Sequence, residues 1–446
     1  MRITSILLSL VVSFSACTHR AAERCADAWT PHALPQSFPS GFGVNIHFTD
    51  PEPGEMKMIA DAGFQWVRMD FKWDLTERER GRYDFSPYER LLRALDEHGI
   101  RALFILDYGN PLYTADKAVR TEQARQAFAR WAIAAAKHFA GRGILWELFN
   151  EPNVPIFWPP KPNVNEYIAL AQTVSRAWRA QVPNEKLIGP ATSGLDFDFL
   201  EPVLKAGLLD YWSAVSVHPY RQTNPEIVAD EYCLLRETIA QYRTANGPAS
   251  PSGQPAWGGG SERDKGSTQQ IPIISGEWGY SSVWRGMNEQ IQGELLARQF
   301  LTNIANGIPI SIWYDWRDDG PDPREPEHHF GLVRHRHFPA RTPIYDPKPA
   351  YHAARTLNTF LNGYTFDRRI SVGSDGDYVL LFRSGGAYRI AAWTSSPVTH
   401  RVTLPGMTGS FMASTFTGEG TREPVSNSQG LTLEISSAPI YLTPRR

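Results

Sequence analysis

The sequence predicts an α/β fold, a (β/α)8 TIM barrel, followed by a small antiparallel β-sandwich. Short apolar segments alternate with amphipathic helical segments from residue 41 to residue 361, and eight such repeats are the number that closes a barrel. Past Gly363 the helical signal stops, and short alternating runs separated by turn residues take its place. With 446 residues, the chain is long enough for one large core and an appended domain.

The barrel elements follow from hydrophobic periodicity. The expected strands are rich in β-branched and aromatic residues and span residues 42–48, 64–70, 101–107, 143–149, 186–190, 214–220, 271–277 and 309–314. The expected helices have apolar residues at helical spacing and span residues 53–63, 84–99, 122–140, 165–181, 198–207, 225–244, 288–306 and 350–361. Gly, Ser and Pro dominate residues 246–268, which indicates a loose loop.

The C-terminal segment reads as strands only. Alternating runs at 378–383, 388–393, 401–404 and 431–435 predict a β-sandwich packed on the barrel. Structural support is the role expected for it, although sugar binding stays open. The predicted domains are thus a barrel over residues 41–362 and a β-sandwich over residues 363–446.

The start of the chain has the features of an export signal. Arg2 supplies a positive charge, residues 6–14 form an apolar run too short to anchor stably in a bilayer, and Ala16 and Cys17 end it. Residues 1–17 therefore read as a signal peptide of the lipoprotein type, and residues 18–40 as a tether. The expected location is the periplasm or cell envelope, with a lipid anchor on Cys17, or otherwise the medium as a secreted protein. Cys25 and Cys233 could pair in an exported protein. The interpretation favoured here is that they stay unpaired, Cys25 as a thiol in the tail and Cys233 as a buried thiol in a helix.

Two glutamates follow predicted strands. Asn150 and Glu151 lie just past the strand at 143–149, where Pro152 ends it, and Glu277 ends the strand at 271–277. Active sites of (β/α)8 barrels are built at the carboxyl ends of the strands. Glycoside hydrolysis needs two carboxyl groups, one to protonate the leaving oxygen and one to attack carbon or activate water. The pair predicts a glycosidase.

The motif Asn150-Glu151-Pro152 and the strand-end Glu277 resemble clan A of the glycoside hydrolases, the retaining β-glycosidases. The resemblance covers about residues 41–361. Within the clan, the chain is similar to family 39-like and family 5-like bacterial proteins, including exported glycosidases associated with exopolysaccharide synthesis. It implies Glu151 as acid/base and Glu277 as nucleophile, acting on a β-linked polysaccharide or oligosaccharide.

Other strand-end residues fit a sugar site. Arg68 ends the expected second strand and can hydrogen-bond Glu277, and Asn150 offers an amide to the sugar 2-hydroxyl. The resemblance implies that Tyr220 hydrogen-bonds the nucleophile, that His218 lines the site, and that Trp313 forms the floor under the reacting sugar. Further candidate substrate contacts are His47, Asp107 and Trp278.

Several function classes are disfavoured. A net charge of −2 gives no reason to expect nucleic acid or an anionic membrane surface as partner. The histidines at 328, 329, 335 and 337 match no zinc-ligand spacing and read as a solvated loop, so neither metal nor cofactor is expected. A non-catalytic carbohydrate-binding barrel is the alternative function, but such a protein would lose one carboxylate. A barrel acting on phosphorylated metabolites would need a glycine-rich loop where residues 315–320 are rich in Trp, Asp and Arg. We expect a monomer.

Overall fold

The computed structural model describes residues 38–245, 270–422 and 424–445. The predicted signal peptide and nearly all of the tether, with Cys17 and Cys25, lie outside these residues, as does the predicted loop at 246–268. Among the helices that are described, none combines the length and the apolar character needed to cross a membrane.

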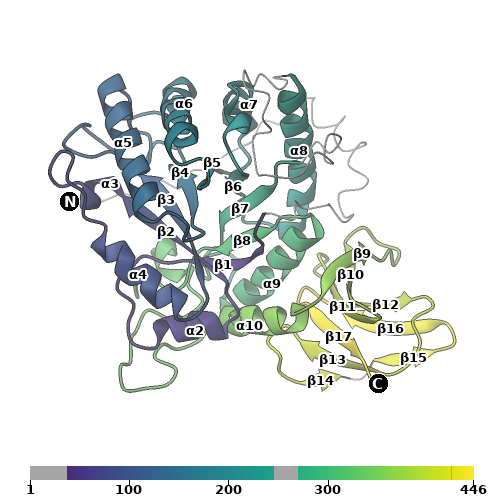
Figure 1. The fold of residues 1–446 in the computed structure, drawn as a ribbon. Helices are drawn as coiled ribbons and strands as arrows, with labels where there is room; N and C mark the ends of the chain where they lie inside the picture. Colours follow the sequence, from purple (N-terminus) through teal and green to yellow (C-terminus); the bar gives the residue numbers. More distant parts are fainter. Residues whose placement is uncertain (1–37, 246–269, 423, 446) are drawn as a thin grey trace.

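Eight parallel strands close into a barrel, which confirms the predicted fold class (Figure 1). Each strand pairs with the next along the chain, and β8 pairs back with β1. The strands are β1 (Gly41–Asn45), β2 (Trp66–Lys72), β3 (Arg101–Asp107), β4 (Leu145–Leu148), β5 (Lys186–Ser193), β6 (Val215–His218), β7 (Ile273–Trp278) and β8 (Ile310–Trp313). Their inward side chains form a separate apolar cluster that fills the lower barrel, including Trp66, Leu103, Ile105, Leu145, Ile188, Ile274 and Ile312.

Helices surround the barrel and bury their apolar faces against the outward strand residues. They are α2 (Glu55–Asp61), α4 (Ser86–Asp96), α5 (Glu122–His138), α6 (Val164–Gln181), α7 (Phe197–Lys205), α8 (Val228–Ala245), α9 (Glu289–Ala305) and α10 (Pro349–Leu361). Short elements that were not predicted are α3 (Trp73–Thr76), η1 (Leu208–Asp210) and η3 (Pro326–His329). The start of the helix predicted over residues 225–244 is a 3-10 turn, η2 (Pro225–Ile227). Side-chain caps from Thr121, Asn163, Asp196 and Asn288 fix the first turns of four helices.

One strand boundary differs in a way that matters for the site. β2 spans Trp66–Lys72, two residues later than predicted, because Gly63 at φ 86° and the turn after α2 delay its start. Arg68 therefore lies inside β2 rather than at its end. The residues that reach the barrel mouth from β2 are Asp70 and Lys72.

The C-terminal residues form two antiparallel sheets that face each other, as expected for a β-sandwich. The six-stranded sheet contains β9 (Thr365–Arg369), β10 (Asp377–Ser384), β11 (Ala387–Thr394), β13 (Phe411–Thr415), β14 (Thr421–Arg422) and β17 (Ile440–Pro444). The three-stranded sheet contains β12 (His400–Leu404), β15 (Val425–Asn427) and β16 (Gly430–Ile435). Five of these strands, β9, β13, β14, β15 and β17, were not predicted.

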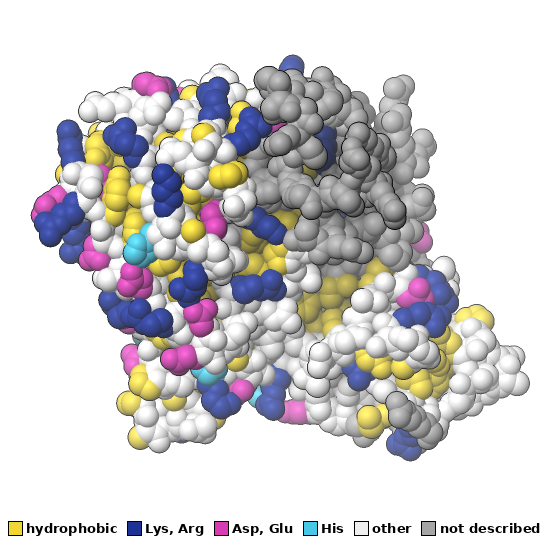
Figure 2. Space-filling view, viewed as in Figure 1, with side chains coloured by type: hydrophobic (Ala, Val, Ile, Leu, Met, Phe, Trp, Pro, Cys, Tyr) yellow, Lys and Arg dark blue, Asp and Glu magenta, His cyan; other side chains and the backbone are white. Residues whose placement is uncertain are grey.

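The sandwich packs beside α9 and α10 of the barrel (Figure 1). Alternate residues of β10 serve the two sides: Val379 and Leu381 belong to the sandwich core, whereas Leu380 and Phe382 belong to the core shared with the barrel. Basic and acidic side chains are interspersed on the face shown in Figure 2, in keeping with the near-neutral net charge.

Candidate active site

A buried arginine connects the polar side chains below the barrel mouth. Arg68 is fully buried on β2, and its guanidinium donates to four side chains besides that of His218. Nε donates to Glu147 (2.7 Å), and one terminal nitrogen donates to Asn150 (2.7 Å). The other terminal nitrogen donates to Glu277 and to Asn45 (3.3 Å). A planar guanidinium held by carboxylates in this way is rigid and permanently charged, and it fixes the side chains around it.

An extra residue in β7 turns Glu277 towards the barrel axis. Ser275 pairs with Ser311 of β8, but Trp278 pairs with Trp313, so β7 takes three steps where β8 takes two. Such a bulge reverses the alternation of side chains beyond it. Glu277 therefore faces inward, where Arg68 donates to one carboxylate oxygen and the Tyr220 hydroxyl donates to the other (2.8 Å).

Glu151 is held by His218, the last residue of β6. His218 is fully buried, and burial lowers its pKa to about 4, so the ring is neutral near pH 7. Its Nε2 lies 3.2 Å from a terminal nitrogen of Arg68, which can only donate. Nε2 is therefore the acceptor, and Nδ1 carries the hydrogen and donates to Glu151 Oε1 at 2.9 Å. The Ser193 side chain also hydrogen-bonds the Glu151 carboxyl, so the group is held in a fixed orientation.

Burial raises the pKa of Glu151 to about 7, although the charge of Arg68 opposes the rise. Glu151 and Glu277 come from strands on opposite sides of the barrel, yet one oxygen of each lies within 4.8 Å of the other. The site thus brings a carboxyl that keeps its proton near neutral pH beside a carboxylate held by two donors. These are the two protonation states that acid-assisted nucleophilic attack requires.

A second wall of the mouth comes from β1 and β8. His47, past the end of β1, lies 3.5 Å from the buried carboxylate of Asp315. Burial opposes the charged ring, but the Asp315 carboxylate raises the pKa of His47 to about 9. The ring of Tyr314 lies between His47 and Tyr220, at centroid distances of 5.6 and 6.4 Å.

Three predicted sugar contacts do not reach the mouth surface. Trp278 and Trp313 are fully buried in the core outside the barrel, and Trp313 donates to the Phe330 carbonyl (3.1 Å). Alternation along β8 puts Trp313 on the outer face with Ser311, so the ring at the mouth is that of Tyr314 instead. Asp107 is also fully buried at the end of β3, covered by its neighbours. Arg68 and His218, likewise fully buried, meet the glutamates rather than open space.

Residues that sequence reasoning missed complete the network. Glu147 is fully buried on β4, and it accepts from Arg68 and from the Ser216 hydroxyl on β6. A carboxylate inside an apolar strand was the signal that could have pointed to it, because such a group needs a buried partner. Tyr314 and Asp70 could have been found only with the register of β8 and β2 in hand.

Two groups of side chains bring three metal-ligand atoms within 4.8 Å of one another: Glu151 with His218 and Glu277, and His47 with Asp315 and Asp319. In the first group the Nδ1 of His218 donates to Glu151 and has no lone pair for a metal. In the second group the raised pKa of His47 favours a charged ring beside Asp315, and a charged imidazole has no lone pair for a metal. The four clustered histidines do not converge on one another. His328 and His329 contact the backbone of Asp322, His335 contacts the carbonyl of Asp318, and His337 contacts Glu52.

Cys233 on α8 is disulfide-bonded, so the expectation of a free thiol in this helix is wrong. The sequence alone could not decide the point, because pairing depends on which segments fold together.

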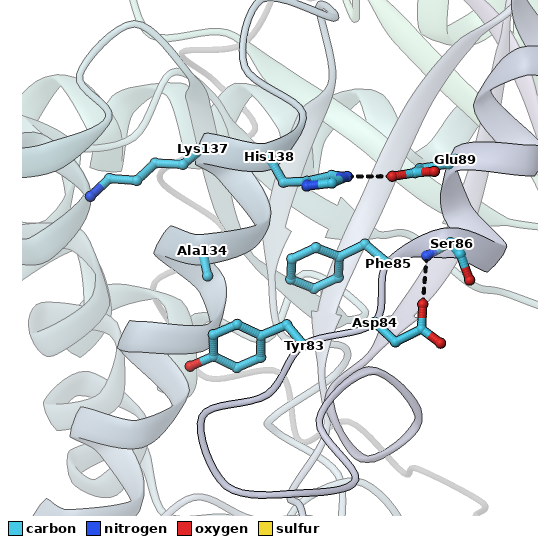
Figure 3. Close-up of a pocket in the computed structure, with 8 residues that line it drawn as sticks. All are labelled: Tyr83, Asp84, Phe85, Ser86, Glu89, Ala134, Lys137 and His138. Atoms are coloured by element: carbon cyan, nitrogen blue, oxygen red, sulfur yellow. Dashed lines mark hydrogen bonds and ion pairs between the residues drawn. The ribbon is translucent and has the colours of Figure 1, made fainter.

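A surface pocket lies outside the barrel between α4, α5 and the loop before α4 (Figure 3). His138 and Glu89 face each other across it at 2.7 Å. Ordinary surface groups line it, and none of them belongs to the barrel mouth, so the convergent side chains of the mouth remain the candidate site.

Comparisons with known proteins agree with this geometry. The model of the cellulase family (glycosyl hydrolase family 5) matches residues 36–319. No curated protein sequence matches the chain.

Three solved structures illustrate the likeness in fold. A family 39 glycoside hydrolase from Bacteroides cellulosilyticus has a TM-score of 0.73 at 24% identity, covering 93% of this chain and 83% of that one. A family 39 β-xylosidase from Caulobacter crescentus has a TM-score of 0.61 at 16% identity (93% and 98%). A family 30 endoxylanase from Clostridium papyrosolvens has a TM-score of 0.60 at 10% identity (94% and 98%). At these identities the likeness concerns the fold.

Proposed function

We propose that this chain, which belongs to the cellulase family (glycosyl hydrolase family 5) and is a glycosidase, cleaves β-linked bonds of a polysaccharide or oligosaccharide with retention of configuration. Glu151 protonates the glycosidic oxygen while Glu277 attacks the anomeric carbon, which gives a covalent glycosyl-enzyme. Glu151 then removes a proton from water, and the water displaces Glu277.

The approach of the two glutamates carries this proposal. One oxygen of each lies within 4.8 Å of the other. Retaining enzymes hold their carboxyls about 5–5.5 Å apart, whereas inverting enzymes need about 6.5–9.5 Å to admit a water molecule. The separation supports direct attack by Glu277. It also disfavours the alternative, a binding barrel without catalysis, which has no need of two converging carboxyls.

Their surroundings support the division of roles. Two donors, Arg68 and Tyr220, stabilise the negative charge that a nucleophile must carry. Burial holds the proton on Glu151, and hydrogen bonds from His218 and Ser193 orient its carboxyl beside Glu277. When the covalent intermediate forms, the charge of Glu277 disappears, and Glu151 can then act as a base.

Azide rescue tests the roles. Glu277→Ala should abolish turnover of every natural substrate. Glu151→Ala should still react once with an aryl glycoside whose phenol is very acidic, and should then stall as the glycosyl-enzyme. Added azide should restore turnover of Glu151→Ala and yield the β-glycosyl azide, because azide needs no general base. An α-azide from Glu151→Ala, or exchanged behaviour of the two variants, contradicts the assignment.

We further propose that the protein is exported and lipid-anchored through Cys17. The disulfide at Cys233 supports an oxidising compartment, since such bonds are rare in the cytosol. Cys17→Ser should release the protein from membranes and leave its activity unchanged. A wild-type protein found entirely in the soluble periplasmic fraction contradicts the anchor.

A further inference from the structure

A carboxylate and an ammonium stand side by side at the mouth end of β2. Asp70 and Lys72 follow Arg68 on the same inward row of the strand, and Lys72 Nζ lies 3.4 Å from Asp70 Oδ2. The Asp70 side chain is 27% exposed and that of Lys72 is 41% exposed, so both can meet a ligand. The mechanism above uses neither residue.

The backbone beneath this pair is fixed by one buried tyrosine of α4. The Tyr88 hydroxyl donates to the carbonyl of Asp70 (2.7 Å) and accepts from the backbone N–H of Lys72 (3.0 Å). Tyr88 packs against Phe71 and Phe104, with ring centroids 4.1 and 5.4 Å away. The pair is therefore held in place before any ligand arrives, which reduces the entropy lost on binding.

Asp107 supports the carboxylate from the side. It is fully buried, Lys72 is its register partner on β2, and no donor group of the described residues reaches either of its carboxyl oxygens. Burial raises the pKa of Asp107 well above its ordinary range, and the charge of Asp70 adds to the rise. The Asp107 and Asp70 carboxyls lie within reach of each other, so a proton favoured on Asp107 by its burial can be donated to the Asp70 carboxylate.

The pair lies one step along β2 from the arginine that holds Glu277. Residues two apart on a strand are about 6.6 Å apart, so Asp70 follows Arg68 at that backbone spacing, on the side of the barrel mouth. A carboxylate accepts a hydrogen bond and an ammonium donates one, and two adjacent sugar hydroxyls offer the complementary set.

We propose that Asp70 and Lys72 bind two adjacent hydroxyl groups of the sugar ring attacked by Glu277, and that Asp107 positions Asp70 for this contact. The inference rests on the proposed function. It names a specificity-determining pair, Asp70 and Lys72, and one positioning residue, Asp107.

The test combines variants with substrates that lack single hydroxyls. Wild type, Asp70→Asn, Lys72→Met and Asp107→Leu are assayed on the best 4-nitrophenyl β-glycoside and on its monodeoxy analogues. Asp70→Asn and Lys72→Met should each lower kcat/KM about 100-fold on the complete sugar. On the one or two analogues without the bound hydroxyls, the same substitutions should cost less than about threefold, because the lost contact is already absent.

Asp107→Leu should behave like Asp70→Asn. Asp107→Asn should retain most activity, because its amide still donates to Asp70. Asp74→Asn is the matched control: Asp74 is an exposed acid two residues past Lys72, and its loss should change kcat/KM less than about twofold. Melting temperatures should stay near that of wild type for the Asp70 and Lys72 variants.

Equal losses by Asp70→Asn on every analogue overturn the inference, since they indicate a general structural effect. So does a loss that Asp74→Asn reproduces. If wild type cleaves none of the glycosides, the proposed function fails. Calorimetry of Glu277→Ala with the same glycosides then still decides whether Asp70→Asn weakens the binding of complete sugars more than of deoxy analogues.

Discussion

At the residue scale, the proton on Glu151 controls the chemistry. Burial raises its pKa to about 7, and the acid form is required for protonation of the leaving group. The value of kcat/KM should therefore fall as pH rises through about 7. Substrates with very acidic phenols should show a weaker fall, because they leave without protonation. If kcat/KM fell equally with rising pH for poor and good leaving groups, the role of Glu151 would be contradicted.

The same proton affects stability. The pKa of Glu151 is higher in the folded protein (about 7) than its ordinary value of 4.5, so the folded state holds the proton more tightly. Stability from this group is complete below about pH 4.5 and is lost as pH rises towards about 7. Glu151→Gln lacks this loss, so its free energy of unfolding should exceed that of wild type by up to about 3 kcal/mol above pH 7. Chemical denaturation at pH 4 and pH 8 measures the difference, which should vanish at pH 4.

Substitution of Trp313, on β8, should mainly affect stability, whereas substitution of its neighbour Tyr314 should mainly affect activity. Trp313 is fully buried in the outer core, so Trp313→Ala should cost about 3–5 kcal/mol of stability. Tyr314 lies at the mouth, so Tyr314→Ala should lower kcat/KM at least tenfold with a smaller change in melting temperature. Paired melting and kinetic measurements test this, and a larger kinetic loss with a stable Trp313 variant would restore the floor role to Trp313.

At the element scale, the bulge of β7 has little room for a side chain. A Cβ on Gly276 would lie 2.4 Å from Ser216 Oγ and 2.9 Å from Glu147 Oε1, both part of the network around Arg68. Gly276→Ala should therefore displace that network and lower kcat by about 100-fold or more. Gly386→Ala is the control, because a Cβ there meets no atom within 4 Å. Wild-type kinetics in Gly276→Ala would show that the network tolerates the shift.

At the scale of the whole molecule, a buried hydrogen bond links the sandwich to an ion pair of the barrel. Glu226 accepts from Arg298 (2.7 Å) within the barrel and from the indole of Trp393 (2.7 Å) on β11. Trp393→Phe keeps most of the packing but leaves Glu226 short of one donor. It should lower the stability by about 1–3 kcal/mol and melt in a single transition. Separate transitions for barrel and sandwich in wild type would show that this contact does not couple them.

The barrel, the sandwich after it and the two glutamates could all be predicted from the amino-acid sequence. Strand–helix alternation is a local property of the chain, and Glu151 and Glu277 lie beside strands that periodicity identifies. Some short strands of the C-terminal domain were not predicted, because runs of three to five residues carry little periodic signal.

Which side chains reach the barrel mouth depends on strand register, which the sequence pattern does not contain. A shift of one residue in a strand moves every side chain to the other face, so the bulge in β7 turns Glu277 inward. Alternation along β8 buries Trp313 and leaves Tyr314 at the mouth, and the later end of β2 brings Asp70 and Lys72 there. The network of Arg68 with Glu147 and His218 joins three strands far apart in sequence. Its geometry arises from closure of the barrel, which no local pattern contains.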